Sequence, residues 1–323
     1  MLGVKILVTG GAGFIGSHLI DRLIERGDEV VCLDSFTDYY PPAVKRRNIK
    51  PHAANPRFTL VDGDICQPKL VAAVFERFRP ARVVHLAARV GVGPSVADPL
   101  AYEEVNCRGT LEILMQSAKY DVEQFLFASS SSVYGASKKL PLVETEACRP
   151  ISPYAATKRA GELFCHTYHH LHGLPVTCLR FFTAYGPRQR PDMAIHRFVR
   201  AIDQQKPIQR YGDGSSRRDY TFVADIVQGI EAAIEKVFDF ETINLGESRT
   251  VSLAELIAAI EKVVGKKAVV EEFPARSEDV TETFADITRA KKLLGYAPKT
   301  AIEEGLAQFW AWYQENREAA GGA

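Results

Sequence analysis

The stretch VTGGAGFIGSHL, residues 8–19, decides the fold. Three of its glycines, Gly10, Gly13 and Gly16, lie between a β-branched run and an amphipathic pattern, which places them in a strand-to-helix turn. Glycines there permit a sharp turn, let backbone N–H groups approach a pyrophosphate, and let the helix pack closely on the strand. The stretch therefore predicts a dinucleotide-binding turn, with Phe14 and Ile15 also lining the cradle.

The next strand expected, residues 29–34, ends in Asp34. A carboxylate at this place bonds a ribose 2′-hydroxyl and repels a 2′-phosphate, so the sequence predicts NAD rather than NADP. The two strands that follow end in DGDI and HLAA, which adds four candidate cofactor residues, Asp64, Ile65, Ala87 and Ala88. The alternative for these segments is ordinary strand-end turn chemistry, and His85 fits a hydrogen-bonded core residue better than a ligand.

Short apolar runs alternate with helical patterns through the first 180 residues. Strands are expected at 5–9, 29–34, 58–61, 82–86, 124–129 and 176–180, and helices at 14–26, 70–78, 106–120 and 154–172. This alternation predicts an α/β fold, a Rossmann-type doubly wound parallel sheet with helices on both faces.

The regularity ends after Arg180. Residues 181–194 look like a loop, a helix is expected at 194–205, and 211–220 is rich in turn residues. A helix at 223–236 and a short run at 242–245 return to the sheet, and the segments 253–264, 268–273, 288–294 and 302–316 form a mixed tail. We therefore predict an NAD-binding domain from residues 1–180 and 222–246. Residues 181–221 and 247–323 form a smaller mixed α/β substrate-binding lobe at the carboxyl ends of the strands.

Composition points to a small-molecule partner. Lys+Arg and Asp+Glu both number 40 in the 323 residues, so no global field attracts nucleic acid or an anionic membrane. The chain opens on a strand pattern and contains no run of about eighteen apolar residues, so a soluble cytoplasmic protein is expected. Six well-separated cysteines without metal-ligand spacing predict reduced thiols, no disulfide and no metal site.

The segment SPYAATKRAGE contains Tyr154 and Lys158, four residues apart and therefore on one face of a helix. A nearby ammonium and a cationic nicotinamide both favour the phenolate, which would make Tyr154 a general base. Alone, this pattern usually marks a solvated helix face. The serine run FASSSSVYG, residues 127–135, ends a predicted strand and can offer a hydroxyl to the same substrate oxygen, although serine is also common where a strand leaves a sheet. Together with a dinucleotide fold, these groups predict a hydride-transfer site.

The segments GGAGFIGSHL, SSSSVYG, YAATK and GDGSSRRDYTFV resemble the extended short-chain dehydrogenases/reductases, and in particular their nucleotide-sugar epimerases. LDSFTDYYPPAVKRRNI and RFFTAYGPRQRPDMA are most similar to the UDP-glucuronate 4-epimerases. The resemblance implies that Tyr154 is the base, Lys158 its electrostatic partner and Ser130 the assisting hydroxyl.

The same resemblance implies several further roles. Asn106 is a structural asparagine of the cofactor site, and Arg218 and Arg276 hold the UDP phosphates. A homodimer would pack through the helices of Asn106 and Tyr154. Two residues depart from the family pattern: Ala184 replaces a bulkier aliphatic residue, and Glu278 stands where glycine is usual. The alternative for each arginine is an ordinary surface ion pair.

Relatives that dehydrate or decarboxylate a sugar carry an acid just before VYG, where this chain has Ser131 and Ser132. Two neutral hydroxyls are poor proton donors or bases, but they suit a carboxylate or hydroxymethyl group at C6. Arg188 and Arg190 lie in the loop after the strand at 176–180, and Arg190, with Thr183, could clamp a C6 carboxylate.

These expectations combine into one predicted activity, 4-epimerisation of a UDP-sugar, most simply UDP-glucuronate to UDP-galacturonate, with tightly bound NAD regenerated in each cycle. Three alternatives stay open. The first is the same reaction on UDP-glucose or a UDP-N-acetylhexosamine, the second a UDP-sugar decarboxylase or dehydratase, and the third a non-enzymic NAD-binding scaffold.

Overall fold

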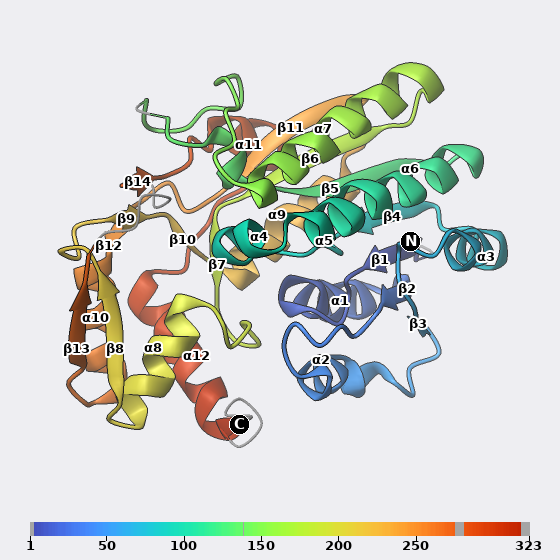
Figure 1. Ribbon diagram of the computed structural model, residues 1–323. Helices are drawn as coiled ribbons and strands as arrows, with labels where there is room; N and C mark the ends of the chain where they lie inside the picture. The colour runs from blue at the N-terminus through green and yellow to red at the C-terminus, as the bar shows by residue number, and fades with distance from the viewer. Residues whose placement is uncertain (1–2, 138, 275–280, 318–323) are drawn as a thin grey trace.

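The computed structural model describes residues 3–137, 139–274 and 281–317. Its centre is a seven-stranded sheet in the order β11-β6-β5-β4-β1-β2-β3, in which every neighbouring pair is parallel (Figure 1). The strand order reverses between β1 and β4, which is where open α/β sheets bind ligands. The strands are β1 Lys5–Thr9, β2 Glu29–Asp34, β3 Phe58–Asp62, β4 Arg82–His85, β5 Gln124–Ser130, β6 Val176–Phe181 and β11 Phe240–Leu245.

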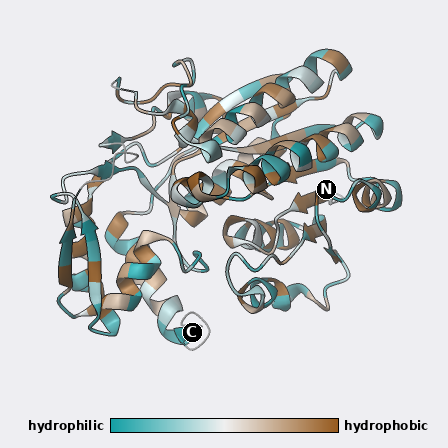
Figure 2. Ribbon diagram, in the orientation of Figure 1, coloured by the Kyte–Doolittle hydropathy of each residue, from teal (hydrophilic) through white to brown (hydrophobic). Residues whose placement is uncertain are grey.

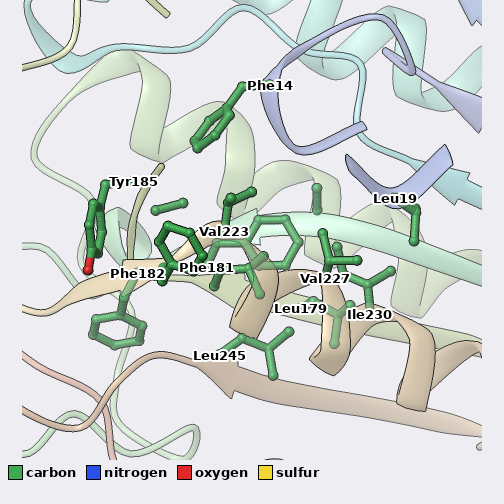
Figure 3. Packing of buried hydrophobic residues seen from close by; sticks show 14 of the residues in the cluster. Phe14, Leu19, Leu179, Phe181, Phe182, Tyr185, Val223, Val227, Ile230 and Leu245 are labelled. Carbon is green, nitrogen blue, oxygen red and sulfur yellow. The ribbon is translucent and has the colours of Figure 1, made fainter. Parts of the chain in front are cut away.

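Helices cover both faces of this sheet because the strand side chains alternate between two cores. On β1, Ile6 and Val8 belong to one hydrophobic cluster, and Leu7, between them, belongs to the other. Figure 3 shows Val227 and Ile230 of α9 near Leu179 of β6 in the first cluster. The helices are α1 Phe14–Arg26, α2 Pro42–Ile49 and α9 Val223–Glu235 on the first side, and α3 Pro68–Phe78, α6 Thr110–Lys119 and α7 Pro153–His172 on the second. The predicted doubly wound parallel sheet is therefore confirmed.

Apart from α9, β11 and the nearby α11, the chain after β6 builds a lobe beside the sheet, at the left of Figure 1. Two short parallel strands, β8 Pro207–Tyr211 and β13 Val269–Phe273, pair in it, and a second small sheet joins β12 Val251–Ser252, β9 Arg217–Arg218 and β14 Glu282–Thr283. Its helices are α8 Ala194–Asp203, α10 Leu253–Val264 and α12 Ile302–Glu315, and α11 Thr288–Leu294 packs near β11. Figure 2 shows brown and teal residues on these helices, as expected of elements with one buried face.

The loop expected at residues 181–194 is partly wrong, because β7 Thr183–Tyr185 lies within it. β7 pairs in parallel with β10 Tyr220–Phe222, some distance away along the chain. Neither three-residue strand has a pattern of its own, and each is stabilised only by the other. This pairing carries the chain from the sheet to the substrate side of the molecule.

The helix expected at 106–120 begins earlier and is interrupted. α5 Pro99–Glu103 starts at Asp98, whose carboxylate accepts the Ala101 N–H, and a π-helical turn, Glu104–Gly109, leads into α6. Such turns often occur at functional sites, and this one contains the buried Asn106. Two short helices, α2 and α4 Val92–Ala97, were not predicted. None of the helices described combines the length and the apolar character needed to cross a membrane.

Candidate active site

A cavity of about 770 Å³ runs along the carboxyl ends of the central strands. Its wall includes the glycine turn after β1, the end of β5, the first turn of α7 and the segment Phe181–Ala184, with Arg218 and Thr283 from the lobe. The cavity thus brings together side chains from both predicted parts of the chain. Within the described ranges, no cluster of three or more His, Cys, Asp or Glu side chains is arranged to hold a metal ion.

The glycine turn forms one end of this cavity. Gly10 has φ +68°, and a Cβ there would lie 2.7 Å from the backbone nitrogen of Ala87. A Cβ on Gly16 would lie 2.4 Å from the carbonyl oxygen of Gly10, whereas one on Gly13 would meet only that oxygen, at 3.1 Å. Gly10 and Gly16 are therefore required by chain packing. Gly13 keeps open space in front of the helix N-terminus, which is the cradle that a pyrophosphate needs.

Asp34 is fixed by the backbone around it. Its carboxylate accepts the N–H groups of Ala12, at 3.0 Å, and Phe36, at 2.9 Å, while the side chain borders the cavity. A carboxylate can accept about four hydrogen bonds, so capacity remains for a ribose hydroxyl. Burial raises the pKa of Asp34, and the hydrogen bonds and the charge of Lys45 oppose that shift. Lys45, which sequence reasoning missed, is buried beside this site and donates to the carbonyl and hydroxyl of Thr37.

The other predicted cofactor residues fall into two groups. One group lies in the cavity wall: Phe14, Ile15, Asp64, Ile65, Ala87 and Ala88. Asn106 lies behind the wall, where its side-chain amide accepts the Arg89 N–H and donates to the Arg89 carbonyl. The same amide also donates to the hydroxyl of Thr157 at 3.0 Å. The structural role expected of Asn106 fits this place. His85 is buried between the hydroxyls of Thr9 and Thr110, and burial lowers its pKa to about 3, so it is a core residue.

Ser130, Tyr154 and Lys158 all border the cavity. Helix α7 starts at Ser152, whose hydroxyl accepts the Ala155 N–H, and this cap directs Tyr154 toward the end of β5. The Ser130 side chain lies near enough to the Tyr154 hydroxyl to lower its pKa. Lys158 donates to the carbonyl of Ala128 at 2.8 Å. The predicted grouping of these three side chains therefore matches the structure.

Burial is the main influence on both ionisable groups of this trio. It raises the pKa of Tyr154, and the hydrogen bond from Ser130 and the charge of Arg190 oppose the shift. Burial also lowers the pKa of Lys158 to about 8. Within the described chain the charge of Arg190 also lowers the pKa of Tyr154, and the electrostatic role expected of Lys158 stays a prediction.

The four serines have different partners. Ser129 donates to the buried carboxylate of Glu162 at 2.5 Å, which makes it part of the strand-end structure. Ser130 accepts hydrogen bonds from the backbone N–H and the hydroxyl of Ser132, at 3.2 and 2.9 Å. Ser131 and Ser132 begin a short 3₁₀ turn, Ser131–Tyr134, and border the cavity. The serine run thus gives the site neutral donors and no carboxylate.

Arg190 and Thr183 border the cavity as predicted. The Arg190 guanidinium donates through Nε and Nη2 to the two carboxylate oxygens of Asp192, both at 2.9 Å. Arg188 lies in the same loop with φ +63°, and its side chain pairs with Asp21 of α1 at 2.7 Å, away from the cavity wall. Of the two arginines that the sequence brings to this loop, only Arg190 reaches the site.

Arg218 lies between the main cavity and a second cavity of about 220 Å³, which is bordered by Phe198, Gln209 and Tyr211. The sequence did not predict this second cavity, because its walls come from α8, β8 and β10, which are separate segments of the chain. Ala184 is buried in β7 and forms part of the main cavity wall. Arg276 and Glu278 lie outside the described residues.

The fold, the glycine cradle and the Ser–Tyr–Lys group define an extended short-chain dehydrogenase/reductase. The family model described as GDP-mannose 4,6 dehydratase matches residues 7–309, and the chain belongs to this family. The resemblance drawn from the sequence motifs is therefore confirmed.

Within that family the chain is similar to nucleotide-sugar epimerases. It is 39% identical to a UDP-glucuronate 4-epimerase of Thermodesulfobacterium geofontis, with 97% of each chain covered. It matches the crystal structure of UDP-glucuronic acid 4-epimerase from Bacillus cereus in complex with UDP-glucuronic acid and NAD, with TM-score 0.92 and 36% identity over 96% of this chain and 99% of that one. A UDP-glucose 4-epimerase from Thermotoga maritima, with UDP-glucose, follows at TM-score 0.89 and 34% identity over 97% and 99%. Overall likeness therefore leaves the choice of sugar to the residues of the site.

Proposed function

We propose that this chain is an NAD-dependent UDP-sugar 4-epimerase that converts UDP-glucuronate to UDP-galacturonate. The observation that carries the proposal is one cavity in which Tyr154 and Ser130 face the same space as Arg190, beside a dinucleotide cradle. The names of the similar proteins support the reaction class and the cofactor.

The residues of the cradle fit NAD. The open space at Gly13 and the α1 N-terminus would receive the pyrophosphate, and the fixed carboxylate of Asp34 would receive a ribose hydroxyl. Bound NAD supplies an acceptor and donor of hydride at C4 of the sugar. Because the same hydride is returned, net redox is zero, and a tightly bound cofactor serves every turnover.

Tyr154 handles the proton of this reaction. Its phenolate takes the proton of the sugar 4-hydroxyl and later gives it back, and the Ser130 hydroxyl stabilises that phenolate by donating to it. Lys158 lies one helical turn further along α7, with its Nζ held by the carbonyl of Ala128. We propose that this fixed ammonium completes the electrostatic setting of the base.

Arg190 supplies the preference for a uronate. Oxidation of UDP-glucuronate at C4 gives a β-keto acid, which loses CO₂ when its carboxylate bond is perpendicular to the carbonyl plane. A guanidinium can hold a carboxylate through two parallel hydrogen bonds, and the hydroxyls of Ser131, Ser132 and Thr183 add further donors. A carboxylate held near the carbonyl plane decarboxylates slowly, which favours inversion over loss of C6.

The smaller lobe would bind the nucleotide part of the substrate. Arg218 borders both cavities, so it can pair with a diphosphate that extends from one into the other. The second cavity contains Phe198 and Tyr211, whose rings suit a nucleobase. Arg276 is proposed as the second phosphate ligand on the family resemblance alone.

We also propose a cytoplasmic homodimer. Leu100 of α5, Met115 of α6 and Leu163 of α7 are 79%, 48% and 52% exposed. These apolar side chains lie on helices that pack together on one face of the molecule, which supports pairing with a second copy. All six cysteines are free thiols, as suits a reducing compartment. Sedimentation of the wild type and of Leu163→Asp tests the dimer.

One observation favours the alternative of a neutral sugar. Arg190 is already paired with Asp192, so its charge is balanced before any substrate arrives. A site for UDP-glucose would need no free cation, and the Thermotoga maritima relative carries that sugar.

The test is turnover of purified protein without added NAD on UDP-glucuronate, UDP-glucose and UDP-N-acetylglucosamine, with the products identified by NMR. We expect UDP-galacturonate, with kcat/KM for UDP-glucuronate at least about tenfold above that for UDP-glucose, as a charged hydrogen-bonded pair would give. Faster turnover of a neutral sugar would move the assignment to the alternative. UDP-pentose as the main product would make the protein a decarboxylase.

A further inference from the structure

The guanidinium of Arg190 uses only part of its hydrogen-bonding capacity. Nε and Nη2 donate to Asp192 from the side of the group, at 2.9 Å each, which uses two of its five N–H donors. In the described part of the chain, Nη1 has no hydrogen-bond acceptor. The end of the guanidinium, formed by Nη1 and the second proton of Nη2, is therefore a complete fork that can take another carboxylate.

Two contacts fix the orientation of that fork. The ion pair with Asp192 sets the direction of the guanidinium within its plane, and the ring of Tyr39, 5.5 Å from Cζ to centroid, supports its face. Tyr39 is itself anchored, because its hydroxyl donates to the carbonyl of Val90 at 3.0 Å. Arg190 contacts both Tyr39 and Asp192, so the three side chains form one cluster around its guanidinium.

The cluster has an inner and an outer side. Arg190 borders the main cavity and its side chain is 17% exposed, whereas Asp192 is absent from the cavity wall and is 40% exposed. Arg190 and Tyr154 border the same cavity, so the guanidinium lies at the space that the proposed catalytic base also borders. Asp192 therefore binds Arg190 from the solvent side, and the free fork of the guanidinium is left to face the cavity.

We propose that Asp192 is a positioning residue that sets sugar specificity, because it orients the free fork of Arg190 toward a carboxylate at C6 of the substrate. The inference rests on the proposed function. A guanidinium held in advance loses little rotational freedom on binding, so the carboxylate gains the full bidentate pair. A neutral hydroxymethyl group cannot use the fork in this way, and gains much less.

Loss of Asp192 has a chemical consequence. The freed guanidinium holds the substrate carboxylate less firmly near the carbonyl plane, and CO₂ is lost more often. In that step the C5–C6 bond breaks, its electron pair enters the C4 carbonyl, and the enolate takes a proton from solvent at C5. The two electrons removed from C4 stay on the bound cofactor, and a UDP-4-ketopentose is formed.

The experiment compares the wild type with Asp192→Asn, Asp192→Glu and Arg190→Ala, with Glu29→Gln as a matched control. Glu29 is a surface carboxylate at the far end of β2 that pairs with Lys5 at 3.1 Å, so its replacement removes one charge outside the site. Affinities for UDP-glucuronate, UDP-glucose and UDP are measured by calorimetry, and products are quantified by NMR. Thermal unfolding checks that each variant is folded.

We expect Asp192→Asn to lower the affinity for UDP-glucuronate by about 5- to 30-fold, the range for a disturbed charged hydrogen-bond pair. The affinities for UDP and UDP-glucose should change by less than about twofold. The share of UDP-4-ketopentose rises several-fold, and Asp192→Glu restores part of the preference. Tighter binding of UDP-glucuronate by Asp192→Asn would mean that Asp192 competes with the substrate, and would overturn the proposal.

The outcomes separate this inference from the proposed function. If the wild type prefers UDP-glucuronate and Arg190→Ala abolishes the preference while Asp192→Asn leaves it unchanged, Asp192 has no positioning role and the proposed function stands. An equal loss of affinity for all three ligands in Asp192→Asn would likewise contradict a specific role. If the wild type shows no preference for the uronate, the proposed function itself fails.

Discussion

The two ends of the main cavity are built in different ways. The end at the glycine turn consists mostly of backbone from one continuous segment, Gly10–Gly16, with Asp34 from the neighbouring strand. The sugar end consists of side chains from segments far apart in sequence, such as Ser130, Tyr154 and Arg190. A site made of backbone can form from a local sequence pattern, whereas a site made of distant side chains forms only when the whole chain has folded.

A single buried carboxylate, that of Asp219, joins the segments beside Arg218. Asp219 accepts hydrogen bonds from the Thr221 hydroxyl, at 2.9 Å, and from the N–H groups of Glu247, Ser248 and Ala285, at 2.7, 3.0 and 3.1 Å. Asp219 follows Arg218 directly, so the arginine proposed to bind the phosphates depends on contacts with two distant segments, residues 247–248 and Ala285. The glycine end has no comparable centre, because packing of strand and helix already fixes it.

The largest effect is expected at the glycine end. Gly10→Ala places a Cβ 2.7 Å from the backbone of Ala87 in addition to forcing alanine into φ +68°. Gly173 is a matched control, since it has the same φ of +68° and open space around its Cβ position. We expect Gly173→Ala to lower the free energy of unfolding by about 1 kcal/mol. Gly10→Ala should lower it by about 1–3 kcal/mol more and remove bound NAD. Equal losses in thermal unfolding would show that the close approach to Ala87 is unimportant.

The second prediction concerns chemistry at the sugar end. Tyr154→Phe removes the hydroxyl that exchanges a proton with the substrate, so kcat should fall by about 100- to 10,000-fold while the affinity for UDP stays the same. Tyr168→Phe, on the same helix but outside the cavity wall, should leave kcat unchanged. Steady-state kinetics with calorimetry of UDP binding decides the matter. A Tyr154→Phe variant with a tenth of wild-type kcat would exclude it as the base.

A smaller effect tests whether the two ends are independent. Asp219→Asn replaces an acceptor by a donor among four donors, and we expect it to lower the free energy of unfolding by about 1–3 kcal/mol. KM for the UDP-sugar should rise because Arg218 is adjacent, while the NAD content of the purified protein should not change. Asp213→Asn, in an exposed turn, is the control. Parallel loss of NAD would show that the two ends are coupled.

The smallest effect is a pH dependence of stability. Burial raises the pKa of Glu247 from its usual 4.5 to about 7, with further increases from Asp225 and Asp219. The folded state therefore holds a proton that the unfolded state has lost, and this contribution to stability disappears as pH rises from about 5 to 8. We expect the Tm of Glu247→Gln, relative to wild type, to increase by about 1–3 °C over that range. A Tm difference that stays constant with pH would contradict this.

The same contrast explains what could be predicted from the sequence. β1, α1 and β2 have the predicted bounds, because strand periodicity and the glycines are local signals. β7 was missed because it exists only through its pairing with β10, and Lys45 because nothing near it in sequence shows that it lies beside Asp34. Asp192 was within reach, since a carboxylate two residues after Arg190 is a natural partner for it.

The loop of Arg188 and Arg190 shows the limit most clearly. Both arginines occur in PRQRPD, and the sequence prediction of Arg190 as the clamp had no local signal that excluded Arg188. The positive φ of Arg188 turns its side chain to Asp21 of α1, and Arg190 is left to the cavity. The backbone conformation of this loop, which depends on packing against distant segments, therefore determines which arginine borders the cavity.

The central claim is that one hydrogen leaves C4 of the sugar and returns to the same carbon. The direct measurement is incubation of purified protein, without added NAD, with UDP-glucuronate deuterated at C4, followed by NMR and mass analysis of the products. We expect UDP-galacturonate that retains deuterium at C4. Replacement of the label by solvent hydrogen, or a UDP-pentose as the main product, would contradict it.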